Sequence, residues 1–222
     1  DKQMVSLRGG EISMVFQDPM TSLDPAFSVG EQIAEVLRVH EGLSAKEARA
    51  EAVKMMELVK IPDAASRYDQ RPYQFSGGMR QRISIAAALA AKPKLLLADE
   101  PTTALDETTR SGIMDLLRNA VRETGAAMLF ITHDLSLVEG TADRVAVMKD
   151  GVIVEEGSTA DVLENPQHEY TKKLLGYLNY SRNKGHDHRS EPERTVPLVE
   201  VRHLHKTYAA DRKKRRTVID DM

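Results

Sequence analysis

The sequence predicts an α/β fold whose core is a parallel sheet. Residues 95–98 form an apolar run that is too short for a helix and leads directly into two carboxylates, Asp99 and Glu100. A second apolar run over residues 126–132 also ends in polar side chains. Buried parallel strands that open onto a ligand crevice have this pattern. Over residues 1–178 such strands alternate with helical segments, as they do in α/β proteins.

Composition narrows the possible classes of protein. The 222 residues are enough for one or two domains with a buried core. The 31 basic and 34 acidic residues give a net charge of −3, which favours neither a nucleic-acid-binding nor a membrane-surface protein. The absence of cysteine excludes disulfides and thiolate clusters and fits a reducing compartment. No apolar run approaches the roughly 18 residues of a membrane span.

The N-terminal part combines one strand with a helical section. Residues 7–16 predict a turn followed by a strand, and residues 27–73 show helical periodicity. Ser44 and Glu47 have the spacing of a capping box, in which each side chain satisfies a backbone amide of the other residue. Apolar faces on both sides of this box are expected to belong to the core. They consist of Val29, Ile33, Val36 and Leu37 before the box, and of Val53, Met56, Leu58 and Val59 after it.

A helix suited to binding an anion is predicted to start at Ser76. Ser76 is a preferred N-cap residue, and Gly77 and Gly78 let the backbone approach a bound group closely. The helix over about residues 78–91 would point free N–H groups and the positive end of its dipole at an anion. At 1.5 Å per residue it is about 20 Å long, which indicates that its N-terminus is remote from Asp99.

The elements after the Asp99 strand are predicted from local signals. A helix over residues 106–124 precedes the strand over residues 126–132. Asp150 and Gly151 have the composition of a type I′ turn and predict a hairpin over residues 144–155. Helices are expected over residues 158–164 and 170–178.

The last part of the chain changes character. Residues 179–197 are polar and charged, as in a linker, so His186 and His188 within them are interpreted as solvated side chains rather than metal ligands. Residues 198–208 alternate like a strand. The basic run over residues 212–216 has no interleaved aromatic residues and predicts a solvated hairpin tip rather than a nucleic-acid site.

Asp99 and Glu100 can perform different chemistry at the end of their strand. Asp99 can hold a Mg²⁺ ion that bridges nucleotide phosphates, and Glu100 can orient and deprotonate a water that attacks the γ-phosphate. Taken alone, the same residues also fit a strand that ends in a solvated acidic turn.

Five segments resemble, in order and spacing, the motifs of an ABC-type ATPase domain. They are Gln17 (Q-loop), residues 76–81 (signature), residues 95–100 (Walker B), residues 104–106 (D-loop) and His133 (switch histidine). The resemblance implies an α/β fold with the P-loop NTPase-like core of this family and a helical subdomain over about residues 18–85. It also implies that the protein binds ATP and Mg²⁺ and hydrolyses ATP.

The resemblance assigns a role to each matched residue. Glu100 is the general base and His133 a catalytic group that contacts the γ-phosphate, while Asp99 and Gln17 hold Mg²⁺. The signature would close over ATP held by a partner domain. Residues 198–222 resemble the start of a second ABC domain, in which Tyr208 matches the aromatic that stacks on adenine. The nucleotide contacts implied in this way are Gln17, Ser76, Gly77, Gly78, Gln81, Asp99, Asp106 and Tyr208.

Other segments resemble the ATPases of oligopeptide and dipeptide importers, including glutathione-type importers. These segments are residues 16–25, residues 79–82 after the signature and residues 166–171. The implied partners are two multi-span membrane permease subunits, a second ABC ATPase domain and, indirectly, an extracytoplasmic solute-binding protein, without nucleic acid. The implied location is peripheral, on the cytoplasmic face of the inner membrane. Phe75 stands where the family usually has Leu, and we expect it to tune activity without abolishing it.

One motif of the family is missing. No G-x-x-x-x-G-K-[ST] phosphate loop (Walker A) occurs in the 222 residues. We therefore expect a piece of a longer, tandem protein: residues 1–178 as a first ABC domain truncated at its N-terminus, residues 179–197 as a linker and residues 198–222 as the start of a second domain. Two alternatives remain, a soluble ABC-type ATPase acting on nucleic acid or ribosomes and a catalytically silent chain.

Overall fold

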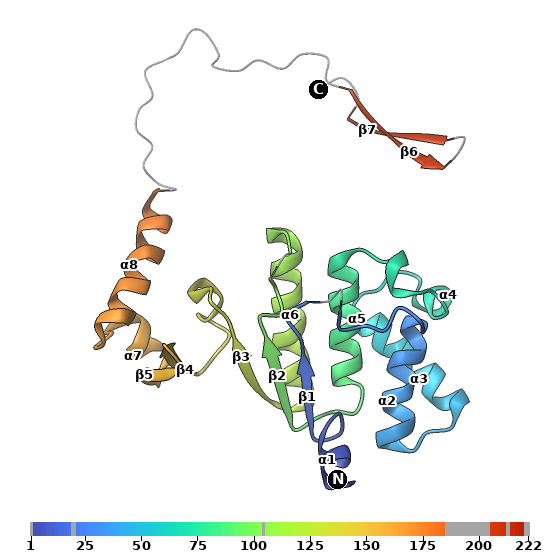
Figure 1. Ribbon diagram of the computed structural model, residues 1–222, viewed down its shortest axis with the longest axis horizontal. Helices are drawn as coiled ribbons and strands as arrows, with labels where there is room; N and C mark the ends of the chain where they lie inside the picture. Colours follow the sequence, from blue (N-terminus) through green and yellow to red (C-terminus); the bar gives the residue numbers. More distant parts are fainter. Residues whose placement is uncertain (1, 19–20, 104, 185–204, 212–213, 220–222) are drawn as a thin grey trace. The chain divides into compact units, whose positions relative to one another are not determined.

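The computed structural model describes residues 2–18, 21–103, 105–184, 205–211 and 214–219 (Figure 1). The chain divides into two units, Asp1–Leu178 and Asn179–Met222. In chain order, the elements up to the helix that crosses this boundary are α1 (Lys2–Leu7), β1 (Ile12–Val15), α2 (Val29–Glu41), α3 (Ala45–Leu58), α4 (Ala64–Arg67), a 3₁₀ turn (Pro72–Gln74), α5 (Gly77–Leu89), β2 (Leu95–Asp99), α6 (Glu107–Thr124), β3 (Ala127–Ile131), a 3₁₀ turn (Leu135–Leu137), β4 (Arg144–Lys149), β5 (Val152–Ser158), α7 (Thr159–Glu164) and α8 (Glu169–Lys184).

Strands β1, β2 and β3 form a parallel sheet in that order. Leu95 of β2 pairs with Ile12 of β1 on one side and with Ala127 of β3 on the other. The crossover from β1 to β2 contains α2 to α5, and α6 connects β2 to β3. Because all three strands run in the same direction, their carboxyl ends meet at one edge of the sheet. The predicted α/β class and parallel sheet are confirmed.

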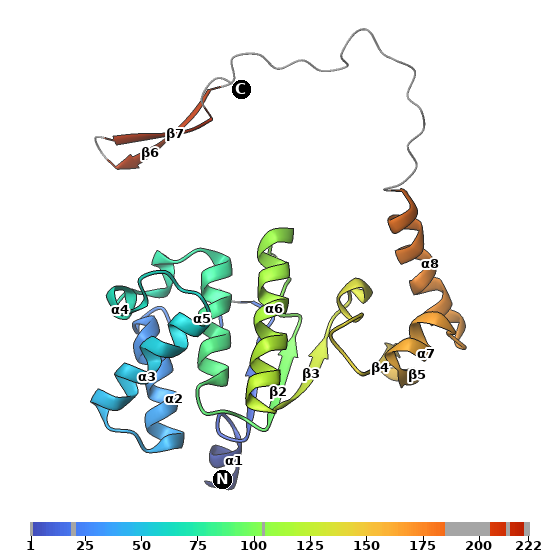
Figure 2. The ribbon, with the colours of Figure 1, turned by 180° about the vertical axis from the view of Figure 1, so that it is seen from behind.

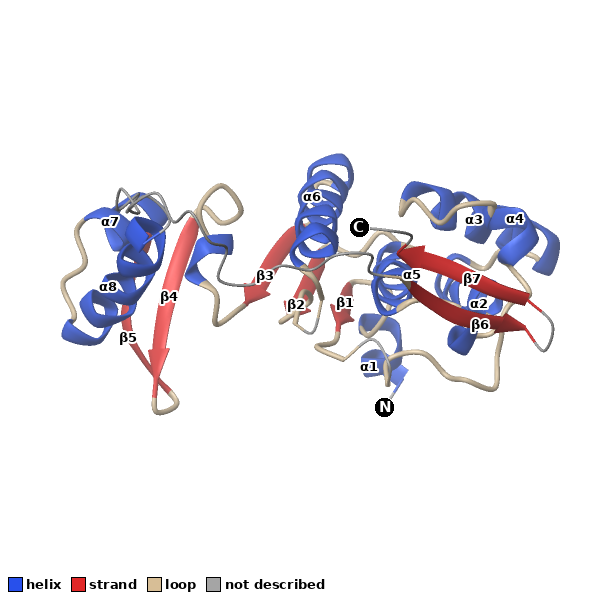
Figure 3. Ribbon diagram, turned by 90° about the horizontal axis from the view of Figure 1, so that it is seen from above, coloured by secondary structure: helices blue, strands red, loops and turns tan. Residues whose placement is uncertain are grey.

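Helices α5 and α6 lie on the same face of this sheet (Figures 1 and 3), and the burial of the strand residues alternates accordingly. Val15, Leu96 and Ala98 are buried. In β3, however, Leu129 is 54% exposed and Ile131 is 47% exposed. Met128 and Phe130, on the other face of β3, are only half-buried. The prediction that β3 is a buried strand is therefore wrong.

The helical section between β1 and α5 is held by the predicted capping box and apolar faces. The Glu47 amide donates to Ser44 Oγ (3.4 Å), and the Ser44 amide donates to Glu47 Oε2 (3.0 Å). Most of the predicted face residues are buried or half-buried, but Leu58 is 48% exposed. The prediction for Leu58 is wrong because it lies about 200° around the helix from the buried Met56.

Tyr68 anchors α4 to α2 and α3. Its ring leaves no room for a side chain at Gly30, where a Cβ atom would lie 2.1 Å from Tyr68 Cδ2. The hydroxyl donates to Glu31 Oε2 (3.1 Å), and the Arg49 guanidinium lies 3.9 Å from the ring centroid. Burial, reinforced by the Glu31 charge, raises the pKa of Tyr68 to about 12.

The predicted hairpin is formed by β4 and β5, which pair in antiparallel fashion. Asp150 and Gly151 have φ angles of 51° and 80°, as a type I′ turn requires. Glu155 of β5 accepts hydrogen bonds from the backbone amides of Gln167 (2.7 Å) and His168 (3.1 Å), and these bonds lower the pKa of its carboxyl. The carboxylate thereby fixes the start of α8 against the hairpin.

The second unit contains the antiparallel strands β6 (Lys206–Asp211) and β7 (Lys214–Ile219), and only the backbone of these strands is described. Helix α8 continues to Lys184, into the segment predicted as a linker. The predictions for His186, His188 and residues 198–204 lie outside the described residues. Among the helices that are described, none is both long and apolar enough to cross a membrane.

Candidate nucleotide site

Three of the predicted site residues follow directly on the three strands of the sheet. Gln17 lies two residues beyond β1, Glu100 is the residue after β2, and His133 lies two residues beyond β3. Because the strands are parallel, their ends bring these side chains together even though they are far apart in the sequence. The structure brings the three side chains together at this edge of the sheet.

The carboxylate of Glu100 is the centre of this site. Gln17 Nε2 donates to Glu100 Oε2 (2.8 Å), and His133 Nδ1 lies 3.0 Å from Glu100 Oε1. An ionised carboxylate only accepts hydrogen bonds, so His133 Nδ1 donates a proton to this bond, and Nε2 is left for another partner. The side chain of Glu100 is 23% exposed and that of His133 is 72% exposed, so a ligand reaches His133 more readily than Glu100.

Hydrogen bonds set the charge state of Glu100. The bond from His133 is the largest cause that lowers the pKa of the Glu100 carboxyl, followed by a bond from Thr103, while burial acts in the opposite direction. Glu100 is therefore an anion at neutral pH, the form that accepts a proton from water.

The backbone at Glu100 is held in an uncommon conformation. Its φ angle is 42°, in the left-handed region that residues other than glycine rarely adopt. Two backbone hydrogen bonds keep it there, one from the Glu100 amide to the Ile131 carbonyl (2.9 Å) and one from the Thr103 amide to the Glu100 carbonyl (3.1 Å). Such a conformation at the end of β2 aims the side chain in a direction that a regular strand would not allow.

Thr103 is a member of the site that the sequence reasoning missed. Its hydroxyl donates to Glu100 Oε2 (2.8 Å), the same oxygen that Gln17 contacts. The signal that could have found it is its position three residues after Glu100 in a turn, where a Ser or Thr side chain commonly bonds to a neighbour.

Asp99 fits a Mg²⁺ ligand by its chemistry. It ends β2 beside Glu100, and its carboxylate has no hydrogen bond or ion pair within the described part of the chain. No three His, Asp or Glu side chains cluster into a metal site among the same residues. A single carboxylate at this edge suits Mg²⁺, which keeps several waters and takes its other ligands from nucleotide phosphates. The Oε1 atom of Gln17 is a second oxygen of the kind that Mg²⁺ prefers.

The signature forms the start of α5, as predicted. Ser76 is the N-cap, and its Oγ accepts from the Met79 amide (3.4 Å). Ser76 and Gly77 are exposed, whereas Phe75 is buried. Helix α5 directly precedes β2 and runs in the direction opposite to the strands. Its N-terminus therefore lies toward the edge of the sheet that carries Glu100 (Figure 1). The length of α5 therefore does not itself separate the signature from the Asp99 end of β2.

Gln81 differs from the other signature residues because its side chain is fully buried. Neither its Nε2 nor its Oε1 has a hydrogen-bond partner within the described residues. A nucleotide would reach this amide only after a rearrangement. Gln81 shares its helix face with Ile85 and Ala88, which are also buried, and that spacing is the signal in the sequence for its burial.

Asp106 caps α6. Its Oδ1 accepts from the Thr109 amide (2.9 Å) and its Oδ2 from the Thr109 hydroxyl (2.7 Å), and these bonds lower the pKa of Asp106. Arg110, one residue further along α6, forms an ion pair with Asp134 (3.2 Å), next to His133. The start of α6 thus connects the Asp106 loop with the loop that carries His133. Ala104, in the predicted D-loop, lies outside the described residues.

Tyr208 lies in β6 of the second unit, where only the backbone is described. Its predicted stacking on adenine stays a prediction.

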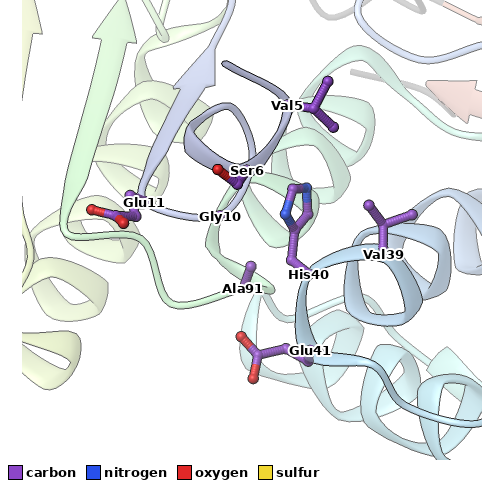
Figure 4. A pocket seen from close by; sticks show the side chains of 8 residues that line it. All are labelled: Val5, Ser6, Gly10, Glu11, Val39, His40, Glu41 and Ala91. Atoms are coloured by element: carbon purple, nitrogen blue, oxygen red, sulfur yellow. The ribbon is translucent and has the colours of Figure 1, made fainter. Parts of the chain in front are cut away.

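A cavity of about 420 Å³ lies away from this site, between α1, the end of α2 and the turn before β1 (Figure 4). The ring of His40 lies beside it, and a Cβ atom on Gly9 would be 2.6 Å from His40 Nε2. None of the residues predicted to act on a nucleotide lines this cavity.

Comparisons with known proteins show the family of the chain. Residues 1–103 match the family model described as "ABC transporter". The dimeric, post-hydrolysis structure of the ATP-binding cassette MJ0796 bound to ADP and Pi is similar at 32% identity and a TM-score of 0.63, over 72% of this chain and 67% of that one. The chain belongs to the ABC transporter family.

Within this family, the chain is similar to ATP-binding proteins of peptide import. It is 52% identical over 79% of its length to the dipeptide transport ATP-binding protein DppD of Bacillus subtilis, and 52% identical over 80% to the oligopeptide transport protein OppD of the same organism. It is also 46% identical over 90% of its length to the glutathione import protein GsiA of Escherichia coli. The chain spans 52% of DppD, 50% of OppD and 32% of GsiA.

Proposed function

We propose that this chain is part of an ATP-hydrolysing subunit that energises the import of peptides or similar small solutes through an ABC transporter. The observation that carries the proposal is the convergence of Gln17, Thr103 and His133 on the Glu100 carboxylate at the ends of three adjacent parallel strands. An anionic carboxylate held by three donors is suited to accept a proton in one defined direction.

In the proposed mechanism, Glu100 takes a proton from the water whose oxygen attacks the γ-phosphorus, and ADP is the leaving group. When both ring nitrogens of His133 carry a proton, Nδ1 donates to Glu100 and Nε2 donates to the γ-phosphate, where the positive ring stabilises the charge of the transition state. Asp99 and the Gln17 amide oxygen would hold Mg²⁺, and the ion would supply positive charge to the phosphates. Gln17 connects this ion to Glu100, because its Nε2 already bonds to the Glu100 carboxylate.

We further propose that a second ABC domain completes the site. Ser76 and Gly77 are exposed at the start of α5, where an N-cap hydroxyl and free amides can bind the γ-phosphate of a nucleotide that the partner domain holds. A phosphate loop is not among the 222 residues. In the proposed layout it belongs to a longer tandem polypeptide, with residues 1–178 as its first ABC domain, residues 179–197 as the linker and residues 198–222, including Tyr208, as the start of its second domain.

The names of the relatives support the proposed partners and location. DppD, OppD and GsiA are named as ATP-binding proteins of dipeptide transport, oligopeptide transport and glutathione import. We propose that two multi-span permease subunits bind this protein at the cytoplasmic face of the inner membrane, where it is peripheral. An extracytoplasmic solute-binding protein would deliver the solute to the permeases.

The test has two parts. A tagged copy of the polypeptide that contains this chain, isolated from its native membranes, should carry two multi-span membrane proteins and hydrolyse Mg²⁺-ATP. Glu100→Gln should reduce this hydrolysis by about 100-fold or more while ATP binding persists. Recovery of ribosomes or nucleic acid with salt-sensitive binding would favour the soluble alternative. Absence of ATP turnover would favour the catalytically silent one.

A further inference from the structure

The two glycines of the signature have different surroundings. A Cβ atom on Gly77 would meet no heavy atom within 4 Å, whereas a Cβ atom on Gly78 would lie 2.5 Å from Cγ2 of Thr109 in α6. Carbon atoms in contact normally keep about 3.5–4.0 Å apart. Gly78 is therefore a place where α5 packs directly onto α6, and Figure 2 shows these helices side by side.

Thr109 cannot easily move away from this contact. Its hydroxyl donates to one oxygen of Asp106 (2.7 Å) and its amide donates to the other (2.9 Å). A β-branched side chain in a helix has few allowed χ1 angles, and a rotation that moved Cγ2 would also break the hydroxyl bond to Asp106. The contact thus links Gly78 to the Asp106 loop through one rigid side chain.

A second contact continues the packing about one turn further along both helices. A Cβ atom on Gly112 of α6 would lie 2.8 Å from Nη2 of Arg82 in α5. The same guanidinium donates through Nη1 to the Val59 carbonyl at the end of α3 (3.1 Å). Positions four apart in α5 and three apart in α6 lie on one face of each helix, so the two contacts form one line.

We propose that Thr109 is a positioning residue for the signature. Through Gly78 it holds the exposed end of α5, Ser76 and Gly77, in a fixed place relative to the Asp106 loop, so that both move as one body. Gly77 is then the glycine that leaves room for a nucleotide, and Gly78 is the glycine that packing requires. This inference rests on the proposed function, since the signature acts there on a nucleotide.

The geometry identifies a compensating substitution. In Thr109→Ser, Cγ2 is gone, while the hydroxyl that bonds to Asp106 remains. The next nearest atoms to a Cβ on Gly78 are Thr109 Cβ and Oγ1, both at 3.7 Å, which is ordinary contact. Because alanine is the better helix former, Gly78→Ala should destabilise the protein when Thr109 is present and stabilise it in the T109S background.

The experiment is a double-mutant cycle in the polypeptide that contains this chain, with two readouts: the urea midpoint of unfolding, and kcat and KM for ATP in the transporter complex. G78A alone should lower the urea midpoint and reduce kcat about tenfold. T109S alone should keep kcat within about twofold of wild type. The double variant should recover the urea midpoint and a kcat within about threefold of wild type. G77A is the matched control: adding T109S to G77A should not restore kcat.

Each outcome decides the inference. Recovery of both the urea midpoint and kcat in the double variant supports it. Recovery of the midpoint without kcat would show that Gly78 itself must contact the nucleotide, and it would overturn the positioning role. No recovery of the midpoint would overturn the contact. A wild-type complex without ATP turnover would overturn the proposed function and the positioning role with it, while the urea midpoints still report whether the contact exists.

Discussion

Replacing Thr103 by valine should slow ATP hydrolysis without weakening ATP binding. Valine keeps the size and branching of the side chain but removes the hydroxyl that donates to Glu100 Oε2 (2.8 Å). This bond is already present before the reaction and lowers the pKa of the Glu100 carboxyl, so its loss slows hydrolysis only by letting the carboxylate turn away from the attacking water. Because Gln17 and His133 still hold the carboxylate, we expect a loss of about 1.4 kcal/mol, a fall in kcat of about tenfold.

The assay is steady-state ATP hydrolysis by the transporter complex, with kcat and KM determined separately. T103S keeps the hydroxyl and is the matched control, which should stay within about twofold of wild type. The effects of the two substitutions should be non-additive, because Thr103 acts through Glu100. In the Glu100→Gln background, Thr103→Val should have no further effect. Wild-type kcat in Thr103→Val, or an equal additional loss in the Glu100→Gln background, would refute the reasoning.

Three further predictions concern the stability of the chain. The pKa of Tyr68 is raised from 10.0 to about 12. The protonated hydroxyl therefore contributes about 2–3 kcal/mol to the free energy of unfolding below pH 10, and this contribution is lost as the pH rises toward 12. Urea unfolding should show this loss in wild type and in Tyr73→Phe, whose ring is exposed, but not in Tyr68→Phe. Ser44→Ala should lower the free energy of unfolding by about 1 kcal/mol by removing the capping box, and an unchanged value would contradict that role. Gln81→Met should raise the free energy of unfolding by about 1–3 kcal/mol, because the buried amide of Gln81 has no hydrogen-bond partner among the described residues. A decrease would show that the amide is hydrogen-bonded.

Features that depend on neighbouring residues could be predicted from the sequence. Ser44 and Glu47 form their capping box within four residues, and the positive φ angles of Asp150 and Gly151 follow from the turn that joins two strands. The resemblance to motifs of ABC ATPases assigns Gln17, Glu100 and His133 to one site, and the rule that parallel strands end at one edge explains why these distant residues meet. The fold class follows from the pattern of the strands, and the centre of the site follows from that resemblance.

Features that depend on how two elements approach each other could not be predicted in the same way. Gly77 and Gly78 are identical in the sequence, and only the packing of α5 on α6 distinguishes them. The exposure of Leu129 depends on what covers the second face of the sheet, which the pattern of an apolar strand does not contain. The bond from Thr103 to Glu100 depends on two side-chain rotamers at a strained turn.

The central claim is that Glu100 is the base of an ATPase, and single-turnover hydrolysis of Mg²⁺-ATP by the transporter complex tests it most directly. Glu100→Gln should bind ATP with wild-type affinity and hydrolyse it about 100-fold or more slowly. Glu123→Gln, an exposed carboxyl near the end of α6, is the control and should behave as wild type. Hydrolysis by Glu100→Gln at the wild-type rate would contradict the account.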